Sequence, residues 1–198
     1  AGKSTLIRLL LGFERPESGV IYYDNHDLKT LDIKELRKNI GCVMQNSKLF
    51  PGSIYSNIII SAPNLTEDDA WEAAKMAGIS EDIEKMPMQM NTIISEGANT
   101  LSGGQRQRII IARAIAAKPK ILLFDEATSA LDNLTQKIVA NSLEKLNCTR
   151  VIIAHRLSTV KNCDRILVLD NGQIAEMGKY DDLMNKRGLF YELVQRQI

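Results

Sequence analysis

The string Gly2-Lys3-Ser4-Thr5 combines residue types that bind phosphate groups, and it stands where a helix is expected to begin. Backbone N–H groups at a helix start carry partial positive charge and attract anions. The four residues fit the second half of the phosphate-binding pattern GxxxxGK followed by Ser or Thr. In that pattern Lys3 reaches the β- and γ-phosphates of a nucleotide, and the Ser4 hydroxyl binds Mg²⁺. A string this short also occurs by chance, so the prediction needs support from other parts of the chain.

Two carboxylates close an apolar run in the second half of the chain. Asp125 and Glu126 directly follow the residues Ile121 to Phe124, and open α/β sheets bind ligands at the carboxyl ends of their strands. Asp125 could hold Mg²⁺ through water, because this ion keeps most of its hydration shell. Glu126 could polarise a water molecule for attack on phosphorus. An acidic pair at a strand end can equally cap the following helix, so this alternative stays open.

The most specific string in the chain is Leu101-Ser102-Gly103-Gly104-Gln105. Two adjacent glycines let the backbone approach an anion closely, and a helix is predicted to begin at Gly104. Ser102 adds a hydroxyl donor at the same place. A generic Ser-Gly-Gly helix start is the alternative interpretation.

Alternating strands and helices are expected to position these residues. Apolar runs predict buried strands over Ile40–Met44, Lys120–Phe124 and Arg150–Ala154, which end next to Gln45, Asp125 and His155. Helices are predicted over Lys3–Leu11, Gly104–Ala116 and Thr135–Leu146, and a hairpin over 165–176. This alternation predicts a parallel, helix-covered α/β sheet.

The residues between about Leu49 and Ala117 differ in character from the rest of the chain, because they lack clear strand patterns. Thr66 and Asp69 form a capping-box pattern at the start of a helix that carries Trp71, which we expect to be a packing anchor. We therefore predict a core made of residues 1–50 and 117–198, with an inserted helical subdomain at residues 51–116.

The composition excludes several classes of protein. The 198 residues are 44% hydrophobic and 25% charged, as in ordinary globular domains, and the net charge of +1 provides no whole-surface field for nucleic acid or anionic lipid. No apolar run approaches the length of a membrane span. The cysteines Cys42, Cys148 and Cys163 are scattered, which favours free thiols in a reducing compartment. There is no signal peptide and the first residue is Ala1, so we expect the chain to start inside a longer polypeptide.

These motifs together resemble the nucleotide-binding domain of ABC transporters. The resemblance is carried by LSGGQRQR at 101–108, ILLFDEATSALD at 121–132 and IIAHRLSTV at 152–160, with GKST at 2–5 resembling the end of the Walker A motif. The motifs occur in the family's order and spacing and cover essentially the whole chain. The resemblance implies an α/β fold of the P-loop NTPase type, with a RecA-like core, a mostly parallel sheet and an inserted α-helical subdomain.

The resemblance also implies a role for each motif, with ATP and Mg²⁺ as cofactors. The residues that would bind ATP are Gly2, Lys3, Ser4, Thr5, Gln45 and Asp125. Those that would hold Mg²⁺ are Ser4, Gln45 and Asp125. Glu126 and His155 would be catalytic, and Asp132 would belong to the D-loop. The signature residues, which would act in trans on ATP held by another subunit, are Ser102, Gly103, Gly104 and Gln105.

The implied partners are a second nucleotide-binding domain and a transmembrane domain, in another chain or upstream of Ala1. We expect the protein at the cytoplasmic face of the cell membrane, in indirect contact with lipid and not bound to nucleic acid. ATP would draw two subunits together, and hydrolysis would release them. Three local sequences resemble those of exporters: Leu49–Ile54, Ser95–Gly97 and AHRLSTV. Peptide or bacteriocin exporters are the most similar.

Two other functions stay open. The first is a soluble ABC-type ATPase that acts on DNA or ribosomes. Members that act on DNA carry a long coiled coil between the Q-loop, which Gln45 resembles, and the signature. Here only 56 positions separate Gln45 from Leu101, and they hold no sustained heptads. A non-catalytic domain would not need both Glu126 and His155. The first P-loop glycine, the strand before it and the aromatic residue that stacks on adenine are absent, so we expect this chain alone to bind ATP poorly.

Overall fold

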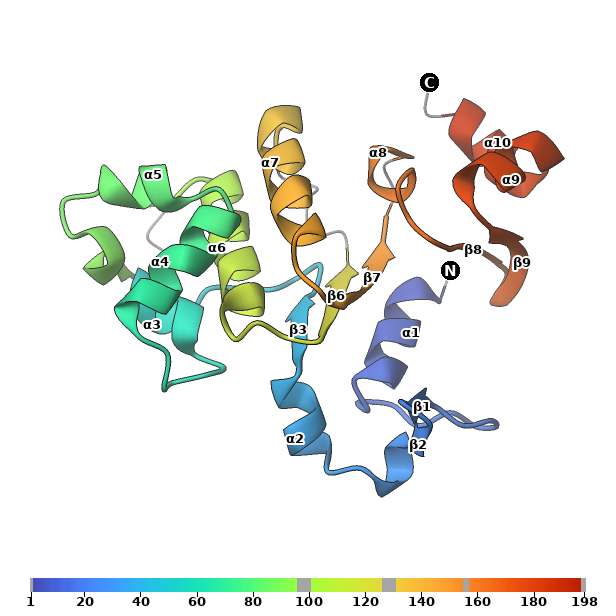
Figure 1. The fold of residues 1–198 in the computed structure, drawn as a ribbon, viewed down its shortest axis with the longest axis horizontal. Coiled ribbons are helices and arrows are strands. Elements are labelled where there is room, and N and C mark those ends of the chain that lie inside the picture. Colours follow the sequence, from blue (N-terminus) through green and yellow to red (C-terminus); the bar gives the residue numbers. More distant parts are fainter. Residues whose placement is uncertain (1, 96–100, 126–130, 155–156, 197–198) are drawn as a thin grey trace.

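The computed structural model describes the chain except for residues 1, 96–100, 126–130, 155–156 and 197–198 (Figure 1). The helices are α1 (Lys3–Leu10), α2 (Ile33–Lys38), α3 (Ile54–Ile59), α4 (Glu67–Met76), α5 (Ser80–Glu84), α6 (Gly103–Ala116), α7 (Asn133–Glu144), α8 (Leu157–Val160), α9 (Tyr180–Lys186) and α10 (Leu189–Gln195). The strands are β1 (Tyr22–Tyr23), β2 (His26–Asp27), β3 (Ile40–Val43), β4 (Gly52–Ser53), β5 (Ile93–Ile94), β6 (Ile121–Asp125), β7 (Thr149–Ile153), β8 (Ile166–Asp170) and β9 (Gln173–Gly178). Two short 3₁₀ turns span Leu28–Thr30 and Gln89–Asn91.

A parallel sheet with the strand order β3-β6-β7 forms the centre of the molecule. Val43 of β3 lies beside Phe124 of β6, and Asp125 lies beside Ile153 of β7. All three predicted buried strands are present within a residue or two of their expected ends, so the predicted parallel α/β sheet is confirmed. The carboxyl ends of the three strands consequently meet at one edge of the sheet.

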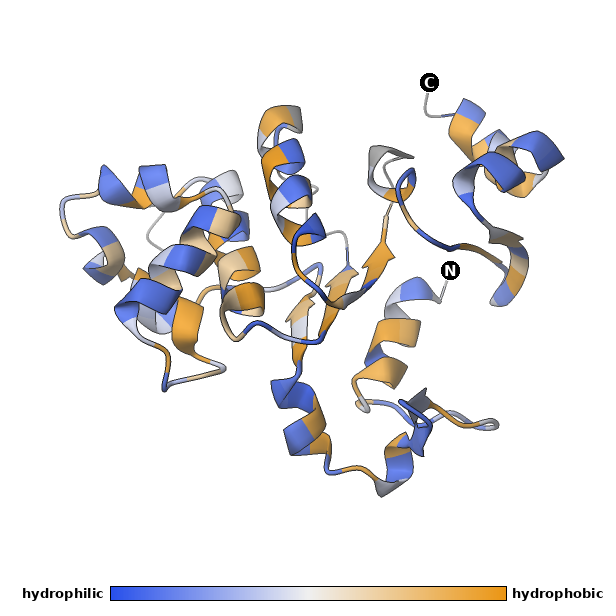
Figure 2. Ribbon diagram, in the orientation of Figure 1, coloured by the Kyte–Doolittle hydropathy of each residue, from blue (hydrophilic) through white to orange (hydrophobic). Residues whose placement is uncertain are grey.

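The two faces of this sheet pack against different helices. Leu122 and Phe124 of β6 belong to the large hydrophobic cluster that contains α6, whereas Leu123 packs with Ile7 of α1 and with Leu11, which directly follows α1. Because successive side chains of a strand point to opposite faces, α1 and α6 cover opposite faces of the sheet, as Figure 1 shows. Figure 2 shows the hydrophobic residues along the three strands between these helices. Burial on both faces explains why the strands are continuous apolar runs in the sequence.

Helices α3, α4, α5 and α6 form one group beside the sheet, on the left of Figure 1. The side chains at its centre are fully buried, among them Ile54, Ile83, Ile109 and Ile111. The predicted capping box at Thr66 is present, with both of its hydrogen bonds to Asp69. No helix in the part of the chain that the structure describes is long and apolar enough to cross a membrane.

Short strand pairs differ from the sequence-based expectations. The middle of the chain was predicted to lack strands, and this is wrong, because β4 pairs with β5 in antiparallel fashion. Strand β1 likewise pairs with β2, across a turn where Asp24 and Asn25 have positive φ. Strands of two residues are too short to produce a recognisable alternation, which explains why the sequence did not reveal them.

The C-terminal hairpin of β8 and β9 was predicted and is present as a separate two-stranded sheet. It packs with α9 and α10 around Leu183, Phe190 and Val194. The buried Glu176 of β9 accepts hydrogen bonds from the backbone N–H groups of Leu189 and Phe190, at 3.2 and 2.8 Å. The carboxylate therefore caps the start of α10.

Gly41 allows helix α6 to lie directly against strand β3. A Cβ atom at this position would lie 2.1 Å from the backbone oxygen of Ala114 and 2.6 Å from Cδ2 of Leu122. Contacts this short are repulsive, and the nearer of them is to backbone, which cannot move aside as a side chain can. The close packing of α6 against the sheet therefore requires glycine at position 41.

We expect Gly41→Ala to lower the free energy of unfolding by about 2–3 kcal/mol, because overpacking would push α6 away from the sheet. Urea unfolding followed by circular dichroism measures the effect. The matched control is Gly103→Ala, where an added Cβ meets no atom within 4 Å. Equal stability losses in the two variants would contradict this account of Gly41.

Candidate functional site

The start of helix α1 offers unsatisfied hydrogen-bond donors. Gly2 precedes the helix in a left-handed conformation, with φ 96° and ψ −4°, and no side chain caps the helix there. The first turn contains no acidic residue. Lys3 is half-buried, whereas Ser4 and Thr5 are exposed. Backbone N–H groups at an uncapped helix start, together with the helix dipole and Lys3, form an environment suited to an anion.

Asp125 lies at the carboxyl end of β6 with only 2% of its surface exposed. Its Oδ1 atom is buried and has no hydrogen-bond partner. Alternation along β6 places Asp125 on the same face as Leu123, which is the face that α1 covers. A buried carboxylate oxygen is costly unless it is paired or bound to a metal. Among the described residues, no group donates a hydrogen bond to this oxygen, which leaves it available to a bound cation.

Mg²⁺ suits this arrangement of oxygen atoms. The ion prefers oxygen ligands and is usually bound by one or two carboxylates together with phosphate oxygens and water. Asp125 supplies the carboxylate, and Ser4 supplies an exposed hydroxyl at the start of α1. Within the described residues, no group of three His, Cys, Asp or Glu side chains could hold a metal ion. A metal at this edge would therefore need oxygen atoms from a nucleotide and from water.

Gln45 is predicted to bind ATP and Mg²⁺ together with residues 2–5 and Asp125, a group called the phosphate-side residues below. It lies in an exposed turn two positions after β3. Hydrogen bonds between Met44 and Ser47 close the turn, at 2.9 Å to the Ser47 hydroxyl and 3.0 Å to the Met44 carbonyl. Because β3 and β6 are parallel neighbours, Gln45 follows the same edge of the sheet at which Asp125 lies. Figure 1 shows the N-terminal end of α1 at this edge too. The structure thus brings the start of α1, Gln45 and Asp125 to one side of the molecule.

The two residues predicted to be catalytic, Glu126 and His155, lie outside the described residues. Their neighbours in the chain are described: Asp125 ends β6, and Ala154 follows β7. Both neighbours belong to the same edge of the sheet, since β6 and β7 are parallel and adjacent. The roles of Glu126 and His155 stay predictions.

Burial affects Cys42, which packs on the α1 face of the sheet. Burial, and to a smaller degree the charge of Asp125, raises the pKa of the Cys42 thiol to about 11. The described cysteines are all free, as expected. Cys42 is therefore a neutral packing residue at physiological pH.

The signature string begins helix α6 one residue earlier than predicted, at Gly103. Ser102 caps the helix: the Gln105 N–H donates to the Ser102 hydroxyl oxygen at 3.1 Å, and the Ser102 N–H donates to Oε1 of Gln105 at 2.9 Å. An added Cβ at Gly103 would meet no atom within 4 Å, and its φ is not positive. Neither space nor backbone conformation within the described chain therefore requires glycine at this exposed position.

The structure does not bring the signature residues together with the phosphate-side residues. Helix α6 covers one face of the sheet, whereas α1 and Asp125 occupy the other (Figure 1). Ser102 would have to pass around the sheet to reach Lys3 of the same chain. The two groups of residues are therefore separate surfaces of one molecule.

Asp132 has a structural role that the sequence motif did not indicate. Its carboxylate caps α7 by accepting hydrogen bonds from the N–H groups of Leu134 and Thr135, at 3.0 and 2.9 Å. The Thr135 hydroxyl donates to it as well, at 2.7 Å. The hydrogen bonds from Thr135 lower the pKa of Asp132. The predicted D-loop residue is thus also the N-cap of a helix.

Sequence analysis missed several polar side chains around α6. Arg113 is half-buried beside the fully buried Asn57 and donates to the side-chain oxygen of Asn57 at 2.7 Å. Arg108 forms a salt bridge with Asp82 of α5 at 2.9 Å. The available indication was the position of Arg113, which stands within a buried run of Ile and Ala residues on α6.

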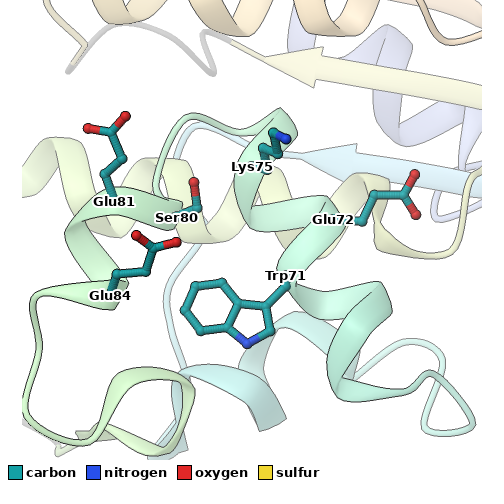
Figure 3. Close-up of a pocket in the computed structure, with 6 residues that line it drawn as sticks. All are labelled: Trp71, Glu72, Lys75, Ser80, Glu81 and Glu84. Atoms are coloured by element: carbon teal, nitrogen blue, oxygen red, sulfur yellow. The ribbon is translucent and has the colours of Figure 1, made fainter.

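A groove lies between α4 and α5, away from the carboxyl edge of the sheet (Figure 3). It has a volume of about 610 Å³ and is lined by Trp71, Glu72, Lys75, Ser80, Glu81 and Glu84. Three carboxylates and one lysine repel a triphosphate more than they attract it. Trp71 packs partly against the main hydrophobic cluster, as expected of a packing anchor. The groove is therefore unsuited to a nucleotide.

Comparisons with known proteins agree with the motifs. Residues 1–129 match the family described as ABC transporter. The alpha-hemolysin translocation ATP-binding protein HlyB of Escherichia coli O157:H7 is 47% identical over 193 residues, which are 96% of this chain and 27% of that protein. The leukotoxin translocation ATP-binding protein LktB of Mannheimia glucosida is 47% identical over an alignment of 201 positions, which covers 100% of this chain and 28% of that protein.

Solved structures give the same result. A bacterial Atm1-family ABC exporter with ATP bound matches 99% of this chain and 35% of its own, with 40% sequence identity and a TM-score of 0.95. This similarity confirms the predicted fold, an α/β core of the P-loop NTPase type with additional helices. The chain spans less than a third of the length of the curated relatives, at 27% and 28%.

We expect Asp125→Asn to raise the free energy of unfolding by about 1 kcal/mol when nucleotide and Mg²⁺ are absent, because it removes a buried charge without a partner. The same variant should lose the increase in unfolding temperature that Mg²⁺ and ATP together give the wild type. Thermal unfolding of the full-length protein with and without these ligands measures both effects. A variant that is less stable without ligands and still stabilised by them would contradict the proposed use of Asp125.

Proposed function

The chain belongs to the ABC transporter family, and we propose that it forms the ATP-binding and ATP-hydrolysing part of an exporter. Two features on one face of the sheet carry the proposal. The start of α1 at Gly2 has no side-chain cap, and the Oδ1 atom of Asp125 has no hydrogen-bond partner among the described residues. One of these features suits the phosphates of ATP, and the other suits a divalent cation. The family's second essential element, the signature string at Ser102, lies on the other face.

Each residue at the phosphate-side edge would contribute in its own way. The N–H groups of Lys3, Ser4 and Thr5 would bind the β- and γ-phosphate oxygens, and the Lys3 ammonium would balance part of their charge. Ser4, Gln45 and Asp125 would hold Mg²⁺. The ion, when bound, would neutralise part of the negative charge of the phosphate oxygens.

Glu126 and His155 would complete the hydrolytic site. Glu126 would accept a proton from the water that attacks the γ-phosphorus, because it directly follows Asp125 at the end of β6. His155 would donate a hydrogen bond to the γ-phosphate from the position after β7. Both assignments rest on the motifs and on the edge of the sheet at which their neighbours lie.

A second copy of this domain, or a related one, would supply the signature residues. Helix α6 covers the face of the sheet opposite to the one that α1 and Asp125 occupy, so one chain would offer two half-sites. The dipole of α6 and the open space at Gly103 suit the γ-phosphate of ATP bound to the other subunit. Two subunits would thus enclose two ATP molecules between them, and Asp132 would lie near their contact.

The packing of the helices supports two subdomains with different functions. Residues 51–116, which contain α3 to α6, would form the signature-bearing subdomain, while residues 1–50 and 117–198 would bind ATP. The segment after Gln45 would pass the change on hydrolysis to a transmembrane domain. That domain would lie in another chain or in the same longer polypeptide.

The cargo of the exporter would be a peptide or protein. The names of two relatives, HlyB and LktB, describe the translocation of hemolysin and leukotoxin. Such an ATPase would work at the cytoplasmic face of a membrane and would contact lipid only through its transmembrane partner. Nucleic acid would not be a partner, since the chain's net charge is only +1.

We expect Glu126→Gln in the full-length protein to bind ATP normally but to hydrolyse it at least about 100-fold more slowly, because the general base is lost. ATP should then hold the variant as a closed dimer, which light scattering after size-exclusion chromatography detects. Glu144→Gln, the same exchange at an exposed position of α7, is the control and should behave as the wild type. Wild-type turnover by Glu126→Gln would show that another group is the base.

We expect Gly103→Ala to be at least as stable as the wild type but to reduce ATP turnover by about tenfold or more, because the added methyl group would meet the partner's nucleotide. Steady-state hydrolysis and urea unfolding of the same preparation measure both effects. Gly41→Ala should behave in the opposite way, with a larger effect on stability than on ATP turnover. Unchanged turnover in Gly103→Ala would contradict a close approach of ATP to this backbone.

A further inference from the structure

We propose that Asp82 is a positioning residue for ATP hydrolysis, which holds the signature residue Ser102 in place for the ATP of the neighbouring subunit. The proposal rests on the function proposed above and adds to it a residue outside the family motifs. Asp82 belongs to α5 and lies 20 positions before Ser102. It reaches the signature through the side chain of Gln105.

Both ends of the Gln105 amide are used in this arrangement. Its Oε1 atom accepts the Ser102 N–H at 2.9 Å, and its Nε2 atom donates to Oδ1 of Asp82 at 2.8 Å. A carboxylate only accepts hydrogen bonds, so it fixes which end of the amide faces it. Asp82 therefore keeps the amide oxygen of Gln105 turned toward Ser102.

Asp82 is itself held from its other oxygen. Nη1 of Arg108 donates to Oδ2 of Asp82 at 2.9 Å and also to the carbonyl oxygen of Gly78. Nε of Arg108 donates to the carbonyl oxygen of Gly104, at 3.3 Å, within the first turn of α6. The side chain of Arg108 is only 15% exposed and that of Asp82 is 32% exposed. The chain Arg108–Asp82–Gln105–Ser102 therefore connects α5 to the first turn of α6.

The function of this chain of hydrogen bonds would be to keep a solvent-facing helix start from fraying. Ser102 is exposed, and among the described residues no atom lies within 4 Å of a Cβ added at Gly103, so these two positions are held by little packing. Without Asp82 the Gln105 amide could rotate, and the Ser102 N–H would lose its acceptor. A displacement of about 1 Å in a positioning group can reduce a rate by about 100-fold.

Removal of Asp82 should affect folding much less than hydrolysis, because the hydrophobic contacts between α5 and α6 remain. The fully buried residues Ile83 and Ile109 do not depend on its carboxylate. Asp82→Asn retains an acceptor for Gln105, so this conservative variant should keep more activity than Asp82→Ala. Glu81→Ala removes a charge from the adjacent, exposed position of α5 and is the matched control.

The experiment measures ATP hydrolysis by heterodimers of the full-length protein, isolated through two different affinity tags. Lys3→Ala disables a subunit's own phosphate site but leaves its signature intact. Asp82→Ala would disable a signature but leave its own phosphate site intact. Paired together, the two variants keep one complete site, so we expect turnover at least about tenfold above that of either homodimer. Glu81→Ala homodimers should hydrolyse ATP at the wild-type rate, with an unchanged KM.

A second pairing separates this proposal from the proposed function. Ser102→Ala with Lys3→Ala tests the trans arrangement alone, without Asp82. If that pair recovers turnover and the Asp82→Ala pair does not, the role of Asp82 is refuted. If neither pair recovers, the trans arrangement is wrong. Wild-type turnover in Asp82→Ala homodimers would also refute the role of Asp82, whereas recovery in both pairs, with Asp82→Asn more active than Asp82→Ala, would support it.

Discussion

Burial of strand β6 on both faces is the constraint on which the rest of the structure depends. Leu122 and Phe124 face α6, while Leu123 and Asp125 face α1. A strand with this pattern can be covered only by helices on both sides of the sheet. The start of α1 and the start of α6 are therefore held on opposite faces by the same five-residue strand. The separation of these two helix starts is thus a consequence of how the hydrophobic core is built, and it is the reason why the proposed site needs a second subunit.

Polar contacts tie helix α6 to its surroundings both near its start and nearer its end. Near its start, Arg108 and Gln105 bind Asp82 of α5. Nearer its end, Arg113 donates to the backbone oxygen of Asn57 at 2.9 Å, to its side-chain oxygen at 2.7 Å and to the Lys48 carbonyl at 2.9 Å. Burial lowers the pKa of Arg113, yet a guanidinium stays charged at any physiological pH. These bonds join α6 to the segment that follows Gln45, so a displacement of that segment would move the signature with it.

The extent to which the sequence predicted the structure varies with the range of the interactions. The strands and α6 were predictable because apolar runs and a glycine pair are local patterns, and the Thr66 capping box spans only three positions. The candidate site residues followed from motif spacing, which places Gln45 and Asp125 at one edge without any knowledge of packing. Asp82 and Asn57 were not predictable, because their partners lie 23 and 56 positions away and nothing local marks them. The two-residue strands β4 and β5 were missed since their pairing depends on the folded helices beside them.

Two glycines on α6 and its neighbouring strand illustrate why residue type alone does not reveal function. Packing inside the chain requires glycine at position 41, because any side chain there would overlap with the backbone of Ala114. Gly103 has no such neighbour and an ordinary backbone conformation, and glycine in the first turn costs helix stability. A residue that costs stability and satisfies no need within the described chain indicates a requirement from outside it. The proposed trans site supplies that requirement, because ATP on another subunit would have to approach this backbone as closely as α6 approaches Gly41.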